Sequence, residues 1–194
     1  MLKCRDYYVK ELLDAKGNLP YFRDVAHRVG GVLSLKYVEE YPHSHNTVLI
    51  PVLRAGSAFE KSFLKRAFPS PRLCYIATKR DCQTLKPEVL YKEWKDYEKA
   101  DTAIILEPML ATGGTMLTVI NEINDCFEPK QIVVISVFVS KQAEESIRDK
   151  ATIIALSKGH DLNEKGYILI PDPYDPKKVT TLDFGDQYCG TRSH

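Results

Sequence analysis

The stretch from Glu107 to Thr115, EPMLATGGT, places an acid, small residues and two adjacent glycines between apolar runs. Glycine has no β-carbon, so the successive backbone amides of Gly113 and Gly114 can converge on one ligand. Amides at the start of a helix also carry the positive end of the helix dipole and favour anions. The hydroxyls of Thr112 and Thr115 add further donors, and the stretch therefore suits a phosphate monoester.

Glu107 opens this stretch at the expected end of a strand, where its carboxylate can accept hydrogen bonds from sugar hydroxyls. The chain contains neither the Gly-x-x-x-x-Gly-Lys-[Ser/Thr] pattern of triphosphate loops nor the Gly-x-Gly-x-x-Gly pattern of dinucleotide folds. A phosphorylated sugar is thus the favoured ligand. On composition alone, an ordinary turn with a solvated acid is the alternative.

Apolar segments of regular length must position this loop. Their periodicity predicts helices at residues 21–40, 57–68 with Ser57 as the cap, 115–125 and 141–150, and strands at residues 47–53, 73–78, 102–106, 131–139 and 151–156. Alternating strands and helices are typical of a parallel α/β sheet. Ligands bind such sheets at the carboxyl ends of the strands, where EPMLATGGT would lie.

Two segments break this alternation. Residues 80–100 are polar, contain Pro87 and alternate in a way that suits a protruding hairpin. Residues 157–194 are rich in turn formers, and we expect a loop region that carries function or stays mobile.

The composition limits the class of protein. A chain of 194 residues with 44% hydrophobic residues fits a single domain over 1–194. The chain has 27 basic and 26 acidic residues, and no segment collects Lys and Arg on one face as a nucleic-acid-binding surface would. No nucleic-acid partner is therefore expected. The five cysteines lack Cys-x-x-Cys spacing, MLKCRDYYVK lacks an apolar signal region, and no apolar run approaches a membrane span, so we expect a reduced, cytoplasmic protein.

Several separated motifs together resemble one family. EPMLATGGT resembles the phosphoribosyl pyrophosphate loop of phosphoribosyltransferases, and its Pro-Met-Leu is similar to uracil phosphoribosyltransferases in particular. YFRDVAHRVGGVLSLKYVEE, IPVLRAGS, TKRDCQTLKP and LNEKGYI resemble that family's early helix, pyrophosphate loop, hairpin start and uracil loop, in the same order. The resemblance covers approximately residues 20–191.

This resemblance implies a type I phosphoribosyltransferase fold: a parallel sheet flanked by helices, with a hood and a protruding hairpin. The hood would come from the N-terminal segment and residues 157–194, and the hairpin arm from about residues 79–100. The implied reaction transfers ribose 5-phosphate from phosphoribosyl pyrophosphate to uracil, giving UMP and pyrophosphate. Positive charge develops on the sugar and negative charge on the leaving group, so binding residues stabilise the transition state and no catalytic nucleophile is expected.

The resemblance also implies site residues. Arg54, Ala55 and Gly56 would hold pyrophosphate together with Arg80, since guanidinium groups engage phosphate oxygens in pairs. Glu107, where the family usually has Asp, would take the ribose hydroxyls. The substrate-binding residues implied in the phosphate loop are Glu107, Pro108, Met109, Leu110, Ala111, Thr112, Gly113, Gly114 and Thr115.

At the base end, Ile168 of GYI matches the family's uracil loop, and PDPYDPKKVTT is then inserted before LDFGDQYCGT. One alignment places Leu182, Asp183 and Phe184 at the family's Gly-Asp-Ala triplet, with Asp183 near the ribosyl pyrophosphate. Leu182 would add a side chain where backbone normally approaches the base, and Phe184 would either stack on a pyrimidine or pack the loop.

A gap-free alignment places Tyr174 and Asp175 at that triplet instead. We prefer the first alignment because GDQYCGT matches the family's ending, although Gln187 replaces its usual Arg.

Magnesium is implied by the pyrophosphate substrate, because Mg²⁺ prefers oxygen ligands and binds through phosphates and water. No dedicated protein metal site is expected, and we interpret His43 and His45 as solvent-exposed. The family's arm contributes to subunit contact, so we expect a homodimer or larger homo-oligomer in which Tyr91, Trp94 and Tyr97 take part.

Two alternatives to uracil phosphoribosyl transfer remain open. One is a catalytically weak nucleotide-sensing regulator on the same fold, and the other is a phosphoribosyltransferase for another nucleobase. An acidic base would need a cation, and Lys177 and Lys178 are the available candidates.

Overall fold

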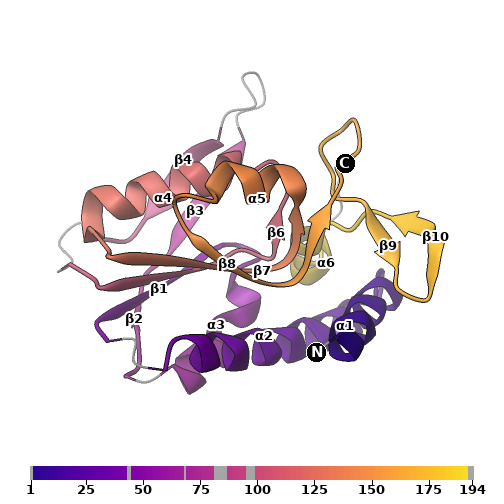
Figure 1. The fold of residues 1–194 in the computed structure, drawn as a ribbon, viewed down its shortest axis with the longest axis horizontal. Helices are drawn as coiled ribbons and strands as arrows, with labels where there is room; N and C mark the ends of the chain where they lie inside the picture. Colours follow the sequence, from indigo (N-terminus) through magenta and orange to yellow (C-terminus); the bar gives the residue numbers. More distant parts are fainter. Residues whose placement is uncertain (1, 43–44, 68, 81–86, 95–98, 192–194) are drawn as a thin grey trace.

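The computed structural model describes residues 2–42, 45–67, 69–80, 87–94 and 99–191 and places a sheet between two layers of helices (Figure 1). The helices are α1 (Leu2–Asp14), α2 (Leu19–Glu40), α3 (Ser57–Arg66), α4 (Gly114–Phe127), α5 (Lys141–Ile147) and α6 (Phe184–Cys189). The strands are β1 (Thr47–Leu53), β2 (Arg72–Leu73), β3 (Ile76–Arg80), β4 (Pro87–Lys92), β5 (Thr102–Leu106), β6 (Met109–Leu110), β7 (Gln131–Ser140), β8 (Thr152–His160), β9 (Ile170–Asp172) and β10 (Asp175–Thr180).

The main sheet has eight strands in the order β4-β3-β1-β5-β7-β6, with β2 paired to β1 and β8 paired to β7. Every pair is parallel except β3 with β4. The predicted parallel α/β sheet is therefore confirmed. Parallel pairing brings the carboxyl ends of β1, β5 and β7 to one edge of the sheet, which is where the loops after β1 and β5 begin.

The central strands are buried on both faces, and alternate side chains enter two different cores. On β5, Ile104 and Leu106 pack with α2 and α3, whereas Ala103 and Ile105 pack with α4. In Figure 1, α4 and α5 cover one face of the sheet, and α1, α2 and α3 cover the other. This burial explains the continuous apolar runs of the central strands.

The structure corrects three local predictions. Ser57 is the first residue of α3 and not its cap: Gly56 is the N-cap, and the Ser57 hydroxyl donates to the Arg54 carbonyl at 2.8 Å. The strand predicted at residues 73–78 is two strands, β2 and β3, which pair with β1 in the same register on either side of Cys74 and Tyr75. The N-terminal segment, to which no element was assigned, forms α1.

The region after residue 157 is also more regular than predicted. β8 continues to His160, and β9 and β10 form an antiparallel hairpin within the expected loop region. Lys10 on α1 donates to Asp172 Oδ2 at 3.0 Å, so α1 and this hairpin lie together at one end of the molecule (Figure 1). The inserted residues therefore form an ordered element, and the prediction of an irregular loop is wrong there.

Trp94 follows β4 and is only 2% exposed. Its ring packs against Phe127 of α4, with centroids 5.6 Å apart. The prediction that Trp94 contributes to a subunit contact is therefore wrong, because the ring belongs to the core of its own chain. Tyr91 is 50% exposed, whereas Tyr97 lies outside the described residues.

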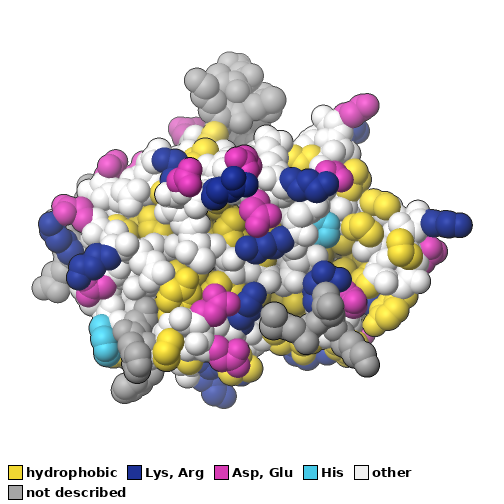
Figure 2. Space-filling model, in the orientation of Figure 1, with side chains coloured by type: hydrophobic (Ala, Val, Ile, Leu, Met, Phe, Trp, Pro, Cys, Tyr) yellow, Lys and Arg dark blue, Asp and Glu magenta, His cyan; other side chains and the backbone are white. Residues whose placement is uncertain are grey.

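Basic and acidic side chains are interspersed on the face seen in Figure 2. The binding of an anion to such a surface depends on a few nearby groups and not on the electrostatic field of a large basic patch. Within the described part of the chain, no helix has the length and apolar character needed to span a membrane.

Candidate functional site

The loop after β5 is anchored to the neighbouring strand β7. Glu107 N–H donates to the Ile135 carbonyl at 3.0 Å, and Val137 N–H donates to the Pro108 carbonyl at 2.9 Å. The Ser136 hydroxyl donates to the same Pro108 carbonyl at 3.0 Å. These bonds explain the short strand β6, which no sequence pattern had indicated, and they fix where Glu107 leaves the sheet.

Gly113 lets this loop turn directly into α4. It is the N-cap of the helix, with φ at 82°, a backbone conformation that favours glycine. A β-carbon at Gly113 would lie 2.0 Å from Ser146 Oγ of α5, so only hydrogen fits there. The Ala111 carbonyl accepts a hydrogen bond from the Ser140 hydroxyl, which also positions the loop from β7. The start of α4 therefore faces the edge of the sheet with little side-chain cover.

The loop after β1 is pressed against the end of β5. A β-carbon on Gly56 would lie 2.2 Å from the Leu106 carbonyl oxygen and 2.7 Å from Val52 N. This close approach brings Arg54 to the same edge as Glu107. The Leu53–Arg54 peptide bond is cis.

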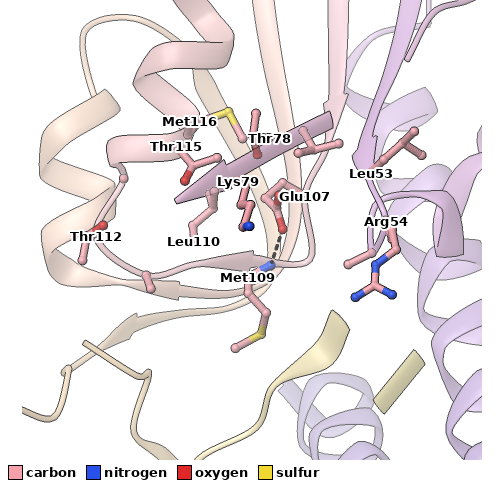
Figure 3. A pocket seen from close by; sticks show the side chains of 14 residues that line it. Leu53, Arg54, Thr78, Lys79, Glu107, Met109, Leu110, Thr112, Thr115 and Met116 are labelled. Carbon is pink, nitrogen blue, oxygen red and sulfur yellow. Dashed lines mark hydrogen bonds between the residues drawn. The ribbon is translucent and has the colours of Figure 1, made fainter. Parts of the chain in front are cut away.

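These loops enclose a cavity of about 290 Å³ (Figure 3). Arg54 enters from the loop after β1, Thr78 and Lys79 come from β3, and Glu107 stands at the end of β5. Its lining residues are Val52, Leu53, Arg54, Ala55, Thr78, Lys79, Glu107, Met109, Leu110, Ala111, Thr112, Gly113, Thr115 and Met116. Two cations, one carboxyl group, three threonine side chains and the start of a helix thus line one cavity.

A second cavity of about 390 Å³ adjoins the first, since both are lined by Ala55, Glu107, Met109 and Ala111. Its remaining lining residues are Lys165, Gly166, Tyr167, Ile168, Asp183, Phe184 and Gly185. The turn before Ile168 is held by the Asn163 side chain, which accepts from Lys165 N–H at 3.0 Å and from Tyr167 N–H at 2.9 Å. The loop from Glu107 to Thr115 thus forms a wall shared by both cavities.

Among the acidic residues that line the two cavities, Glu107 has the most strongly shifted pKa. Burial raises the pKa of its carboxyl to about 8, the Asp183 carboxylate adds to the rise, and a hydrogen bond from Met109 N–H at 3.4 Å opposes it. At neutral pH the carboxyl therefore carries a proton. In that form it can both donate and accept a hydrogen bond.

The structure brings most of the sequence-predicted residues to these cavities. Gly56, Pro108, Gly114 and Leu182 are not among the lining residues: Gly56 and Pro108 position the loops from behind, and Leu182 is buried in the core. Arg80 is described only by its backbone, at the end of β3.

Phe184 borders the second cavity, yet its ring is fully buried. It packs edge-on against Phe22 at 5.0 Å and against Phe59 at 5.9 Å. Of the two roles considered for this ring, the structure therefore shows packing.

The two alignments of the base loop differ in what they bring to the cavities. Asp183, which belongs to the preferred alignment, lines the second cavity together with Ile168 and Glu107. Tyr174 is 67% exposed in the β9–β10 hairpin, and neither it nor Asp175 lines either cavity. Lys177 and Lys178 lie exposed on β10 and also stay outside both cavities, while His45 is exposed and the structure does not describe His43.

Sequence reasoning missed four polar residues that line the cavities: Thr78, Lys79, Lys165 and Tyr167. Thr78 and Lys79 directly precede Arg80 in the quoted motif TKRD, and their position at the end of a strand beside the site was the available signal. Lys165 and Tyr167 flank a glycine within LNEKGYI, where a tight turn exposes both neighbours.

Known proteins resemble this chain in sequence. The family model described as uracil phosphoribosyltransferase matches residues 20–191. The uracil phosphoribosyltransferase of Sulfurisphaera tokodaii is 35% identical over 136 residues, covering 64% of this chain and 62% of that protein. That of Metallosphaera sedula is 31% identical over 134 residues, covering 64% of this chain and 61% of that protein. The matched part thus spans about three fifths of the length of these curated relatives.

Solved structures resemble the fold. The AQ2163 protein from Aquifex aeolicus has a TM-score of 0.76 at 21% identity, over 96% of this chain and 93% of that one. A hypoxanthine-guanine phosphoribosyltransferase from Bacillus anthracis has a TM-score of 0.52 at 12% identity, covering 79% and 85% of the two chains. A purine phosphoribosyltransferase from Pyrococcus horikoshii has a TM-score of 0.52 at 19% identity, covering 72% and 93%. The architecture is that of type I phosphoribosyltransferases.

Proposed function

The chain belongs to the uracil phosphoribosyltransferase family, and from this premise we propose that it transfers ribose 5-phosphate from phosphoribosyl pyrophosphate to uracil. The products are UMP and pyrophosphate. One observation carries the proposal: the stretch Glu107 to Thr115 walls two adjoining cavities, one with Arg54 and Lys79 and the other with Ile168 and Asp183. A sugar phosphate held on this wall would have its leaving group on one side and the base on the other.

The 5-phosphate is assigned to the start of α4. The backbone amides of Ala111 to Thr115 and the hydroxyls of Thr112 and Thr115 are the donors, and the helix dipole favours the anion. Gly113 supports this role because its positive φ and its close packing on Ser146 let the loop turn directly into α4.

The pyrophosphate is assigned to the cavity that Arg54 and Lys79 line, with Arg80 as a further expected partner. The bond between the anomeric carbon and the pyrophosphate oxygen breaks as the uracil N1 bonds to that carbon, and the N1 proton passes to water. Fixed cations beside the departing oxygen stabilise the charge that develops on it.

The ribose hydroxyls are assigned to Glu107. Its carboxyl, protonated at neutral pH, can donate to one hydroxyl and accept from its neighbour. The base is assigned to the second cavity, where the turn from Lys165 to Ile168 presents backbone groups suited to a small ring with amide-like edges.

Magnesium is part of this proposal. The carboxyl groups of Glu107 and Asp183 line one cavity, and the described residues contain no group of three or more His, Cys, Asp or Glu side chains arranged to hold a metal. That donor set fits an ion that arrives with the substrate and keeps phosphate oxygens and water as its main ligands. Arriving with the substrate, magnesium would neutralise charge on the pyrophosphate.

The test is a panel of nucleobases with phosphoribosyl pyrophosphate and magnesium, followed by pyrophosphate release and chromatography of the nucleotide. We expect uracil to be consumed and UMP to form. Consumption of a different base would show that the assigned substrate is wrong and that the assigned reaction class is right. Nucleotide binding without any pyrophosphate release would contradict the proposed reaction and favour a nucleotide-sensing regulator.

Arg54→Ala serves as the site control in this assay. We expect roughly a 100-fold or greater loss of kcat, the usual cost of removing one group that stabilises transition-state charge. Normal turnover by this variant would contradict the assignment of the pyrophosphate.

A further inference from the structure

Thr191 joins the end of the C-terminal helix α6 to the loop after β1. Its hydroxyl donates to Asp186 Oδ1 at 2.7 Å and accepts from Arg54 Nη2 at 3.4 Å. A hydroxyl that donates to a carboxylate turns its lone pairs toward other donors, and the two bonds polarise each other. The Arg54 guanidinium thus has a partner that is distant in the sequence.

Helix α6, which precedes Thr191, is held against α2. Arg23 Nε donates to the Tyr188 carbonyl at 2.8 Å, and His27 Nε2 lies 3.1 Å from the Tyr188 hydroxyl. Gly17 N–H also donates to Gln187 Oε1 at 2.7 Å. With the Phe184 ring buried beneath it, α6 has little freedom to move relative to the sheet.

The end of α6 directs Thr191 back toward the site. Gly190 N–H donates to the Asp186 carbonyl at 2.9 Å, which closes the helix. Thr191 is the residue just beyond this closure. Its hydroxyl contacts both the Asp186 side chain and the Arg54 guanidinium.

The other end of α6 borders the second cavity. Asp183 is the N-cap of the helix, and its Oδ1 accepts from Asp186 N–H at 2.9 Å. The same residue lines the cavity assigned to the base. One short helix therefore touches the base cavity at its start and the pyrophosphate cation just beyond its end.

We propose that Thr191 is a positioning residue for Arg54, and that α6 thereby couples the base cavity to the pyrophosphate end of the site. The inference rests on the proposed function, in which Arg54 holds the leaving group. A guanidinium held in one orientation spends less conformational entropy on binding phosphate oxygens than a free one does.

Thr191→Val tests this role, because valine keeps the shape and removes the hydroxyl. We expect kcat/KM for phosphoribosyl pyrophosphate to fall about 3- to 10-fold, the range for one lost hydrogen bond. Thr191→Ser should keep most of the wild-type value. The matched control is Thr152→Val at the exposed start of β8, which should be unchanged.

The decisive comparison repeats Thr191→Val in an Arg54→Ala background. If Thr191 acts through Arg54, its hydroxyl has nothing left to position, and the second substitution should cost less than twofold. An equal loss in both backgrounds, or a Thr191→Ser variant as impaired as Thr191→Val, would overturn the inference.

Calorimetric titration with magnesium pyrophosphate separates this inference from the proposed function. We expect Thr191→Val to weaken binding about 3- to 10-fold in the wild-type background and not in Arg54→Ala. If this pattern holds while no base is consumed, Thr191 keeps its role and the proposed reaction fails. If wild-type turnover is normal and neither assay shows coupling, the inference alone fails.

Discussion

At the scale of single residues, Glu107 makes the stability of the protein depend on pH. Its folded pKa is about 8, against an ordinary value of 4.5, so between these values the folded protein holds a proton that the unfolded chain releases. This contribution to the free energy of unfolding therefore falls as pH rises through that window. Glutamine cannot ionise, and a Glu107→Gln variant should lack this fall.

We expect Glu107→Gln and the wild type to have similar unfolding free energies at pH 5. At pH 9 the variant should be more stable by roughly 2 to 4 kcal/mol, since each pKa unit corresponds to about 1.4 kcal/mol. Urea unfolding of the ligand-free protein at both pH values measures the difference, with Glu164→Gln as an exposed control. A gap that does not change with pH would show that Glu107 is ionised in the folded protein.

Lys79 is a second residue-scale prediction, because it lines the first cavity and forms no ion pair with another described residue. If pyrophosphate binds there, Lys79→Ala should lower kcat/KM for phosphoribosyl pyrophosphate by roughly 10- to 100-fold, the range for one charge-assisted hydrogen bond. Lys61→Ala, exposed on α3, should have no such effect in the same steady-state assay. Equal losses in the two variants would show that Lys79 contributes only to the overall positive charge and does not contact the pyrophosphate.

At the scale of elements, the junction of the Glu107–Thr115 loop with α4 provides a matched pair of glycines. Gly113→Ala has to adopt a positive φ and displace Ser146, which should cost roughly 1 to 3 kcal/mol of stability. Gly114→Ala meets nothing nearer than Thr112 Oγ1 at 3.8 Å and should leave stability nearly unchanged. Thermal unfolding compares the two, and similar melting temperatures would mean that the loop can rearrange around a side chain.

The elements also show which parts of the fold could be predicted from sequence. Helix α2 and strands β1, β5 and β7 were predicted because continuous apolar runs and helical spacing directly reflect burial. The hairpin β9–β10 was missed because its exposed strand carries Asp, Pro and two lysines, and its partner is a three-residue strand. Its order comes from tertiary contacts, such as Lys10 with Asp172, that leave no periodic pattern.

The same contrast applies to the site. The Glu107–Thr115 stretch was predicted from the composition of a loop at a strand end, and Arg54 was predicted from the resemblance of IPVLRAGS to a known family. Lys79 and Thr191 were not, since their importance depends on which side chain lies across a cavity or beyond a helix. Such neighbours follow from the assembled sheet and not from local spacing.

At the scale of the whole molecule, Trp94 reports on cooperativity. It is the single tryptophan of the chain, and its buried ring links the segment after β4 to α4. We expect its fluorescence to shift to longer wavelength in one transition that coincides with the loss of helical circular dichroism. A fluorescence change at lower denaturant concentration would show that this segment detaches before the core unfolds.

The hairpin β9–β10 has a practical consequence. Tyr174 lies exposed at its turn, and neither Tyr174 nor Asp175 lines a cavity. A fluorophore or an affinity peptide attached at this turn would therefore remain accessible to solvent without obstructing the site. The insertion thus provides a natural handle for immobilising the protein or following its motion.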